Sequence, residues 1–190
     1  MTRAEDPRPA RTRAAILAAV ESLSSRNAAI TVSAIVDAAG ISRSAFYAQY
    51  RDLDALAVAV LSEAFAGIEQ VDLALRRTRT SRETAVTTTT QLVEAFSRNR
   101  ALYAGVLSGR TTEAHRAVQD AFAAQARGTM LATAPPHLDA DVAARYVAGG
   151  TLSVLVEWIG SEHPEPAERI QQQLLNLLPA WLLNDERHLP

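Results

Sequence analysis

The chain has 190 residues, of which 48% are hydrophobic and 21% charged, and its formal net charge at pH 7 is −2. This length allows a sizeable core, and the small net charge argues against a generic polyanion binder. The absence of cysteine excludes a disulfide framework and a thiolate zinc site, and the four histidines offer no ligand pair at i, i+4 spacing. We therefore expect no metal and no cofactor.

The charge is unevenly distributed along the chain. Residues 1–51 hold seven arginines and four acidic residues, a net charge of +3, which leaves −5 for the remaining residues. A basic head on an acidic body is typical of DNA-binding proteins. No apolar run reaches the roughly 20 residues that a membrane-spanning helix needs, and the N-terminal segment lacks the apolar region of a secretory signal. We expect a cytoplasmic protein without membrane contact.

The first helix is expected from about Arg11 to Ser24, after a charged, Pro-rich arm. Pro7 and Pro9 disfavour an earlier start. The helix carries one apolar stripe at Ile16, Leu17, Val20 and Leu23. The basic residues near the N-terminus can follow a DNA backbone or enter a minor groove, and for Arg3 and Arg8 a solvated tail is the alternative. The basic residues of this segment are Arg3, Arg8, Arg11 and Arg13.

Two short helices separated by a tight turn are predicted next, from Thr31 onward. Thr31 can cap a helix whose inward face, at i, i+3 and i+4 spacing, is formed by Ile35, Ala38 and Ala39. Gly40 supplies the left-handed conformation that ends such a helix without a Cβ clash. The chain can therefore turn sharply at this point.

The second short helix begins after Ser42, a natural N-cap. Phe46 and Tyr50, at i and i+4, are expected to anchor it inward, which leaves a small, polar outer face that carries Arg43. A turn of three or four residues with glycine between two short helices is typical of the helix-turn-helix. In that motif the second helix enters the DNA major groove.

The pattern T-V-x-x-I-x-x-A-A-G-I-S-R-S-A-F-Y, followed by Y-R-D-L-D-A-L, resembles the DNA-binding domain of the TetR (tetracycline-repressor-like) family of transcriptional regulators. The resemblance runs from near Arg11 to near Leu56. The sequence departs from the family pattern at Gln49, where histidine is common, at Leu53, where lysine is common, and at Ala45, where threonine or serine is common. These departures concern individual DNA contacts rather than the domain.

The residue types predict separate roles at the DNA. Arg43 is the candidate base reader, because a guanidinium can bond O6 and N7 of guanine; a phosphate contact is the alternative. Ala45 can meet a thymine methyl group, while Tyr47, Gln49 and Arg51 are expected at phosphates, with Arg51 replacing the family's lysine. The predicted DNA-binding residues are Thr31, Ser33, Ser42, Arg43, Ser44, Ala45, Tyr47, Gln49 and Arg51.

The rest of the chain predicts helices only, so we expect an all-α protein of about nine helices. A long helix from Asp52 to about Leu75 starts in the head and ends in the body, and is expected to be the only continuous path between them. The segment 76–83 is predicted as a loop, and Pro179 is predicted to kink the last helix. The expected domains are a helix-turn-helix DNA-binding domain at 1–51 and an effector-binding and dimerisation domain at 52–190.

The last two predicted helices are unusually apolar, and the earlier one contains two adjacent glycines. Each glycine in a helix interior lowers the stability of the helix by about 1 kcal/mol relative to alanine. A crossing of helices at a two-fold axis would explain them; the alternative is that the apolar stripe faces the chain's own core. The resemblance implies that these helices form a four-helix dimer interface. The predicted interface residues are Gly149, Gly150, Leu155, Leu174, Leu178 and Trp181.

The resemblance further implies a small-molecule pocket in the body, whose occupation shifts the fourth helix and separates the DNA-binding heads. A mostly apolar lining suggests a hydrophobic or aromatic effector, although plain core packing accounts for each candidate as well. The candidate ligand-binding residues are Phe65, Ile68, Phe96, Tyr103, Leu107, Phe122, Tyr146 and Trp158.

These features predict a DNA-binding transcriptional regulator, a homodimeric repressor released from an inverted-repeat operator by a small, largely apolar effector. An enzyme is disfavoured, because the sequence has no Gly-rich phosphate loop, no nucleophile elbow and no metal-ligand cluster. A helical protein-interaction module that has lost DNA binding is the alternative, for which Ala45 and Leu53 leave room. Activation rather than repression is equally compatible with the sequence.

Overall fold

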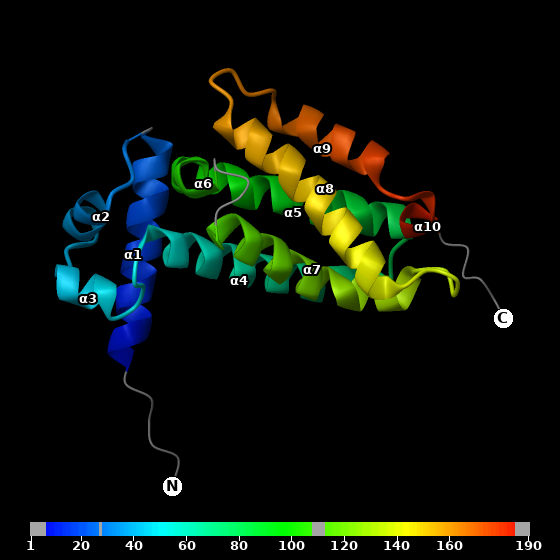
Figure 1. Ribbon diagram of the computed structural model, residues 1–190, viewed down its shortest axis with the longest axis horizontal. Coiled ribbons are helices and arrows are strands. Elements are labelled where there is room, and N and C mark those ends of the chain that lie inside the picture. Colours follow the sequence, from blue (N-terminus) through cyan, green and yellow to red (C-terminus); the bar gives the residue numbers. More distant parts are fainter. Residues whose placement is uncertain (1–6, 27, 108–112, 185–190) are drawn as a thin grey trace, which may run out of the picture.

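The computed structural model describes residues 7–26, 28–107 and 113–184, and within these ranges the chain forms ten helices and no strand (Figure 1). The predicted all-α class is confirmed. The helices are α1 (Pro7–Ser25), α2 (Val32–Ala39), α3 (Arg43–Tyr47), α4 (Leu53–Leu75), α5 (Ser81–Arg98), α6 (Arg100–Leu107), α7 (Glu113–Thr133), α8 (Ala140–Gly160), α9 (Ala167–Leu177) and α10 (Ala180–Leu183).

Three helix boundaries differ from the prediction, each for a local reason. The helix α1 begins at Pro7, because N–H groups of a first turn need no intrahelical partner and proline is tolerated there. The helix α5 begins inside the predicted loop, because Thr80 and Glu83 form a capping box. Pro179 interrupts the last helix rather than kinking it, since it disfavours helical backbone at Leu178. Arg3 lies outside the described residues.

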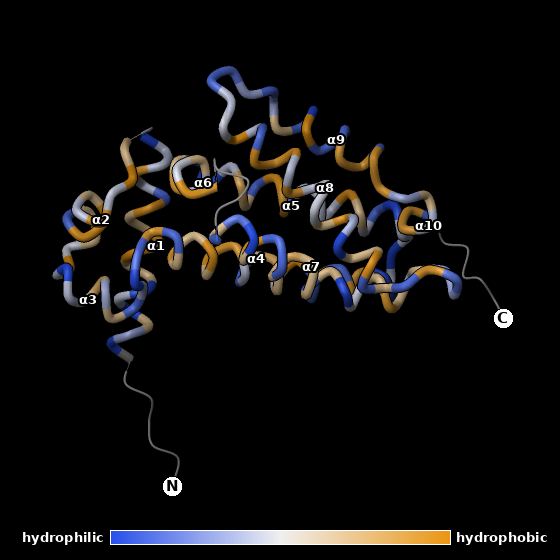
Figure 2. Tube along the Cα trace, in the orientation of Figure 1, coloured by the Kyte–Doolittle hydropathy of each residue, from blue (hydrophilic) through white to orange (hydrophobic). Residues whose placement is uncertain are grey.

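The head and the body occupy opposite ends of the molecule. The helices α1, α2 and α3 pack together at one end, and α4 runs out of this group alongside α7 (Figure 1). The helix α8 packs across α7, and α9 lies on α5. Figure 2 shows apolar and polar segments alternating along the helices, as expected where each helix buries one face.

One apolar core joins the head to the body. It runs from Ile16 in α1 through Phe46 and Phe65 to Leu174 in α9, without a break between the two ends. The helices α5 and α6 also pack against α1, where Arg98 Nε lies 3.6 Å from Glu21 Oε1. The helix α4 is therefore not the only path from the body to the head, which corrects the prediction made from the sequence.

By length and composition alone, α8 could cross a membrane. In the structure it packs against α5, α6, α7 and α9, and seven of its side chains are buried. A core helix of a water-soluble protein meets the same criterion of length and composition. Burial within the body thus accounts for the apolar character of these seven positions of α8.

Tyr103 gives this core a measurable response to alkaline pH. Its side chain is buried beside Phe96, and its hydroxyl accepts a hydrogen bond from Asn99 Nδ2 at 3.4 Å. Burial raises the pKa of Tyr103 from 10.0 to about 12, because the phenolate loses its hydration. The neutral phenol therefore stabilises the fold fully below pH 10, and this stabilisation is lost as the pH rises through the folded-state value.

We expect the free energy of unfolding to fall by about 2 to 3 kcal/mol more in the native chain than in a Tyr103→Phe variant between pH 10 and pH 12. The chain contains no lysine and no cysteine, so few other side chains titrate in this window. Urea unfolding at a series of alkaline pH values measures the difference. Parallel pH profiles for the two proteins would contradict the prediction.

Candidate DNA-binding surface and ligand cavity

Hydroxyl side chains fix the start of both short helices in the head. Thr31 Oγ1 accepts a hydrogen bond from the backbone N–H of Ala34 at 3.1 Å, and Ser42 Oγ accepts one from Ala45 at 3.1 Å. Each cap residue has an extended backbone. These bonds satisfy N–H groups that the first turn of a helix leaves without a partner. Both predicted caps are confirmed.

The turn between these helices has the predicted geometry. Gly40 ends α2 with a φ of 64°, a left-handed conformation that favours glycine. The next residue, Ile41, donates its N–H to the carbonyl of Val36 at 3.1 Å. The inward face of α2 differs from the prediction: Ile35 and Val36 are buried, whereas Ala38 is exposed, because α2 meets α1 and α3 along the Ile35–Val36 side.

Aromatic packing holds the outer face of α3 in place. Phe46 is fully buried, and its ring centroid lies 6.0 Å from that of Tyr50, which is also buried. Tyr47 packs edge-on against Phe46 at 5.5 Å but leaves 51% of its surface exposed. Two inward rings thus anchor a helix of only five residues, as the sequence predicted.

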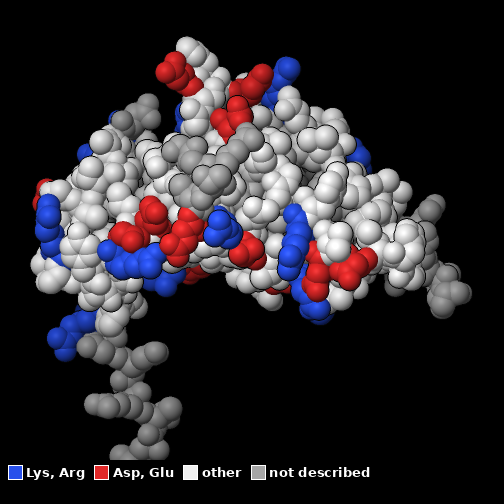
Figure 3. All heavy atoms as spheres, in the orientation of Figure 1, with Lys and Arg blue, Asp and Glu red and all other residues white. Residues whose placement is uncertain are grey.

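The predicted DNA-binding residues lie on α2, α3 and the turns beside them. Most are exposed, and only Ala45 and Gln49 are half-buried. Arg43 is exposed and forms no ion pair within the described part of the chain, whereas Arg51 Nε lies 3.1 Å from Asp52 Oδ2. Figure 3 shows basic side chains at the outer edge of the head, beside α2 and α3. Of the two arginines, Arg43 is thus the better placed to contact a binding partner of the head.

One basic residue near the N-terminus has an intramolecular partner instead. Arg13 in α1 forms an ion pair with Glu63 in α4. Both side chains are more than a third exposed, so this pair contributes little to stability. It nevertheless ties α1 to the helix that enters the body, a role that the sequence did not indicate.

The body contains a cavity of about 100 Å³ between α4, α5, α7, α8 and the C-terminal helices. Three predicted ligand-binding residues, Phe65, Ile68 and Phe122, line it. The rings of Phe65 and Phe122 are stacked, with centroids 4.5 Å apart. Leu174 and Leu178, predicted at the dimer interface, also line this cavity.

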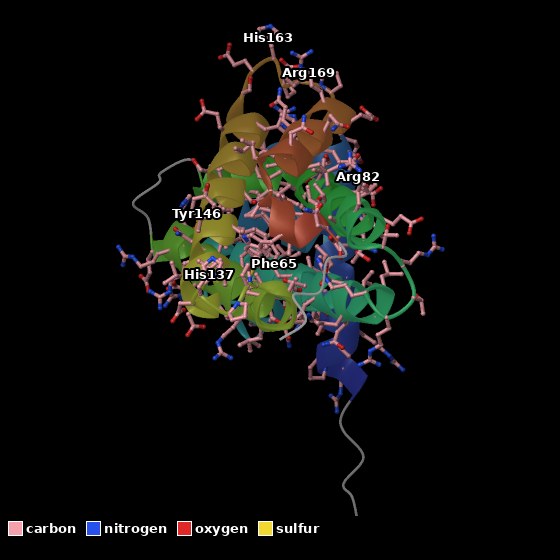
Figure 4. All side chains as sticks on the ribbon, turned by 90° about the vertical axis from the view of Figure 1, so that its right-hand side faces the viewer. Phe65, Arg82, His137, Tyr146, His163 and Arg169 are labelled. Carbon is pink, nitrogen blue, oxygen red and sulfur yellow. The ribbon has the colours of Figure 1, made fainter. Side chains whose placement is uncertain are left out.

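The other ligand-binding candidates lie outside the cavity. Phe96, Tyr103 and Leu107 are buried in the core. Tyr146 is 71% exposed on the outer side of α8, away from Phe65 in the interior (Figure 4). Trp158 is half-buried, and its Nε1 donates to the carbonyl of Glu165 at 2.7 Å. Phe96, Tyr103 and Leu107 therefore pack in the core, which was the alternative to ligand binding.

The cavity also has a charged wall that sequence reasoning missed. Asp72 is only 6% exposed, and Arg76 donates to both of its carboxylate oxygens, at 2.7 and 3.3 Å. Thr129 of α7 donates to the same carboxylate at 2.8 Å. The sequence held a signal for this wall, because Asp72 continues the helical spacing of the buried residues Leu61 and Phe65.

Glu69 stands one turn before Asp72 on the same wall. Burial raises the pKa of its carboxyl, the backbone of Gly128 lowers that pKa, and the negative charge of Asp72 raises it. A Cβ atom on Gly128 would lie 2.2 Å from Glu69 Oε1. The carboxylate of Glu69 therefore occupies the space that any side chain at position 128 would fill.

The predicted interface residues have mixed positions. Leu155 is fully buried and Leu174 is 4% exposed, so both face the chain's own core, as the alternative reading allowed. Leu178 and Trp181 pack against the small cluster around Met130 and Leu182.

The two adjacent glycines of α8 differ in their surroundings. A Cβ on Gly149 would meet Gln119 Nε2 at 3.0 Å, so the end of the Gln119 side chain from α7 packs closely there, whereas a Cβ on Gly150 would meet open space. Two large apolar side chains on the same helix, Val142 and Tyr146, are 61% and 71% exposed. At i, i+4 and i+8, Val142, Tyr146 and Gly150 form one exposed face of α8.

Among the described residues no group of three or more His, Asp or Glu side chains could hold a metal ion. No protein-family model matches the chain, and no curated protein sequence matches it. Solved structures do match, over nearly their whole length. FadR from Thermus thermophilus, a TetR family transcriptional repressor in complex with lauroyl-CoA, is 19% identical; the match covers 94% of this chain and 98% of that chain, with a TM-score of 0.62.

Two further solved structures give the same result. RolR in complex with resorcinol is 18% identical, with 96% of each chain covered and a TM-score of 0.59. FadR from Bacillus subtilis in complex with stearoyl-CoA is 14% identical, with 92% of this chain and 99% of that chain covered and a TM-score of 0.57. This protein therefore has the fold of the TetR-family transcriptional regulators, as its helix-turn-helix sequence predicted.

Proposed function

We propose that the protein is a cytoplasmic, homodimeric transcriptional regulator that binds an inverted-repeat DNA operator through residues 1–51. The observation that carries this proposal is the outer face of α3. Its backbone is held by the Ser42 cap and by the buried ring of Phe46, and it presents Arg43 to solvent without an ion-pair partner among the described residues. An exposed guanidinium on a helix held in this way suits recognition of guanine in the major groove.

The surrounding residues suit contacts with the DNA backbone. Thr31 and Ser33 lie exposed at the start of α2, where free N–H groups favour a phosphate. Tyr47 and Ser44 present exposed hydroxyls on α3. Ala45 is half-buried and has no polar side-chain atom, so we assign it an apolar contact. These contacts would position Arg43 rather than read sequence.

The body, residues 52–190, is proposed to bind a small effector in its cavity and to form the dimer. The similar structures are of regulators, two with an acyl-CoA and one with resorcinol, which favours a ligand-responsive repressor over an enzyme. Phe65, Ile68 and Asp72 of the cavity lie on α4, whose first turn follows the head directly. Occupation of the cavity can therefore displace the head through α4, and also through the contacts of α5 and α6 with α1.

A helical interaction module without DNA binding is the second candidate. Two features favour it: Leu53 stands where the family pattern commonly has a lysine, and Arg51 already has Asp52 as a partner. The distinguishing experiment is selection of genomic DNA fragments with the purified full chain. We expect enrichment of an inverted repeat whose half-sites are centred one DNA turn or more apart, about 34 to 36 Å per turn. If no repeat is enriched, the regulator proposal fails and the interaction module gains support.

Two arginine variants separate base reading from phosphate binding. We expect Arg43→Ala to relax base preference at one position of each half-site, at a cost of about 1 to 3 kcal/mol in discrimination. Arg51→Ala should weaken all sequences alike and reduce the dependence of binding on salt. Fluorescence anisotropy with the selected operator and point-mutated operators, at several salt concentrations, measures both effects.

Arg79→Ala is the control for this pair, because Arg79 is exposed in the turn between α4 and α5, far from α3. It should leave operator affinity and salt dependence unchanged. Equal, sequence-blind losses from Arg43→Ala and Arg51→Ala would overturn the assignment of Arg43 to a base.

We place the dimer interface on the exposed face of α8 that carries Val142, Tyr146 and Gly150. A two-fold axis beside Gly150 would let two copies of α8 approach closely, because no side chain intervenes there. Dimerisation would cover the exposed ring of Tyr146 and the exposed side chain of Val142. An apolar face without a partner among the described residues is consistent with such an interface.

A glutamate at this face should therefore weaken the dimer. We expect Val142→Glu to raise the dimer dissociation constant about tenfold or more, since the interface would bury an unpaired charge. Sedimentation velocity over a range of protein concentrations measures the constant. Val86→Glu, the same change at an exposed valine of α5, is the control and should leave it unchanged. Retention of a native-like dimer by both Val142→Glu and Tyr146→Glu would exclude this face.

A further inference from the structure

The wall of the cavity carries an excess of negative charge. Glu69, Asp72 and Arg76 are the acidic and basic residues that line it. Asp72 and Arg76 neutralise each other through two hydrogen bonds, and Thr129 donates a third hydrogen bond to Asp72. Glu69 has no cationic partner among the described residues. The carboxylate of Glu69 is thus the one charge on this wall that a ligand can neutralise.

Gly128 makes room for that carboxylate. A Cβ at position 128 would lie 2.2 Å from Glu69 Oε1 and 3.3 Å from its Cδ, so the side chain of Glu69 rests directly against the α7 backbone. Glycine is less favourable than alanine in the interior of a helix, and position 128 lies well inside α7. Glycine at position 128 therefore makes α7 less stable than alanine would, but it leaves the space in which the Glu69 carboxylate lies.

The rest of the lining is mainly apolar. The stacked rings of Phe65 and Phe122 form part of it, together with Leu92 and Met130. An engineered apolar cavity of ~150 Å³ accommodates benzene, so a cavity of about 100 Å³ suits a ligand whose apolar body is smaller than a benzene ring. Aromatic faces near a carboxylate favour a cation, because ring faces are electron-rich and an ammonium–carboxylate hydrogen bond is charge-assisted.

We propose that this cavity binds a small organic cation, a protonated amine on an apolar body, with its ammonium group against Glu69. The proposal rests on the proposed function and names the ligand class of that same site. An anionic ligand would face both Glu69 and Asp72, while the guanidinium of Arg76 is already bonded to Asp72. A neutral alcohol could donate to Glu69 but would leave its charge unpaired.

The electrostatics of the cavity agree with this class. Burial raises the pKa of Glu69, because the charged carboxylate loses hydration there. An ammonium group against the carboxylate would offset this loss. Because Glu69 belongs to α4, the cation would bind directly to the helix that continues into the head.

The test compares three probes that share one short branched chain. Isothermal titration calorimetry on the full chain at pH 7 would use isobutylamine, isobutanol and isobutyrate. We expect the amine to bind about tenfold or more tighter than the alcohol, and isobutyrate to bind weakest. Glu69→Gln should abolish the preference for the amine and leave alcohol binding unchanged. Glu94→Gln, an exposed α5 position outside the cavity with the same change of charge, should alter neither.

Gly128→Ala provides a second variant whose effect cannot be attributed to unfolding. Its methyl group should displace the Glu69 carboxylate while alanine favours the helix, so we expect an unchanged or higher Tm together with loss of the amine preference. Amine binding no tighter than alcohol binding, including no binding of either, would overturn the proposal, as would an amine preference that survives Glu69→Gln. The assay contains no DNA, so its failure leaves the operator selection untouched, and failure of that selection leaves this result standing.

Discussion

The structure depends on the burial of one continuous face of α4. Leu56 and Leu61 are fully buried, and Phe65 is 2% exposed, so the same helix takes part in the core of the head and in the core of the body. Burial of each such side chain stabilises the fold by about 1.5 to 3 kcal/mol. The helix cannot detach from either end at low cost. A change at the cavity must therefore move α4 as a packed unit.

The contacts of α5 and α6 with α1 restrict how that unit can move. Because Arg98 of α5 lies beside Glu21 of α1 and the apolar core is continuous, the head is held by the body at two places. Rotation of the head about α4 alone would break the second contact. If a ligand acts as proposed, the change it causes would thus be a concerted shift of α1 and α4, a small adjustment between packed helices rather than a free hinge.

The head was predictable from sequence because its signals are local. Thr31 and Ser42 cap through bonds to residues three positions ahead, and Gly40 ends α2 through its own backbone conformation. The body was less predictable, because helical spacing identifies an apolar stripe but not the element that it meets. Leu174 therefore suited a dimer interface or the core equally well. Its place in the core follows from the packing of α9 on α5, which no local pattern encodes.

Two residues near the cavity depart from local preferences in the sequence: Asp72 lines the cavity, and Gly128 lies against Glu69, another lining residue. Asp72 is a charged residue at a buried position of α4, and Gly128 is a glycine inside α7. A core selected only for stability would favour an apolar residue at the first position and alanine at the second. Departures from local preference that converge on one cavity are typical of a functional site. Gly149, which also lies inside a helix, has a structural explanation instead, because Gln119 packs closely against it.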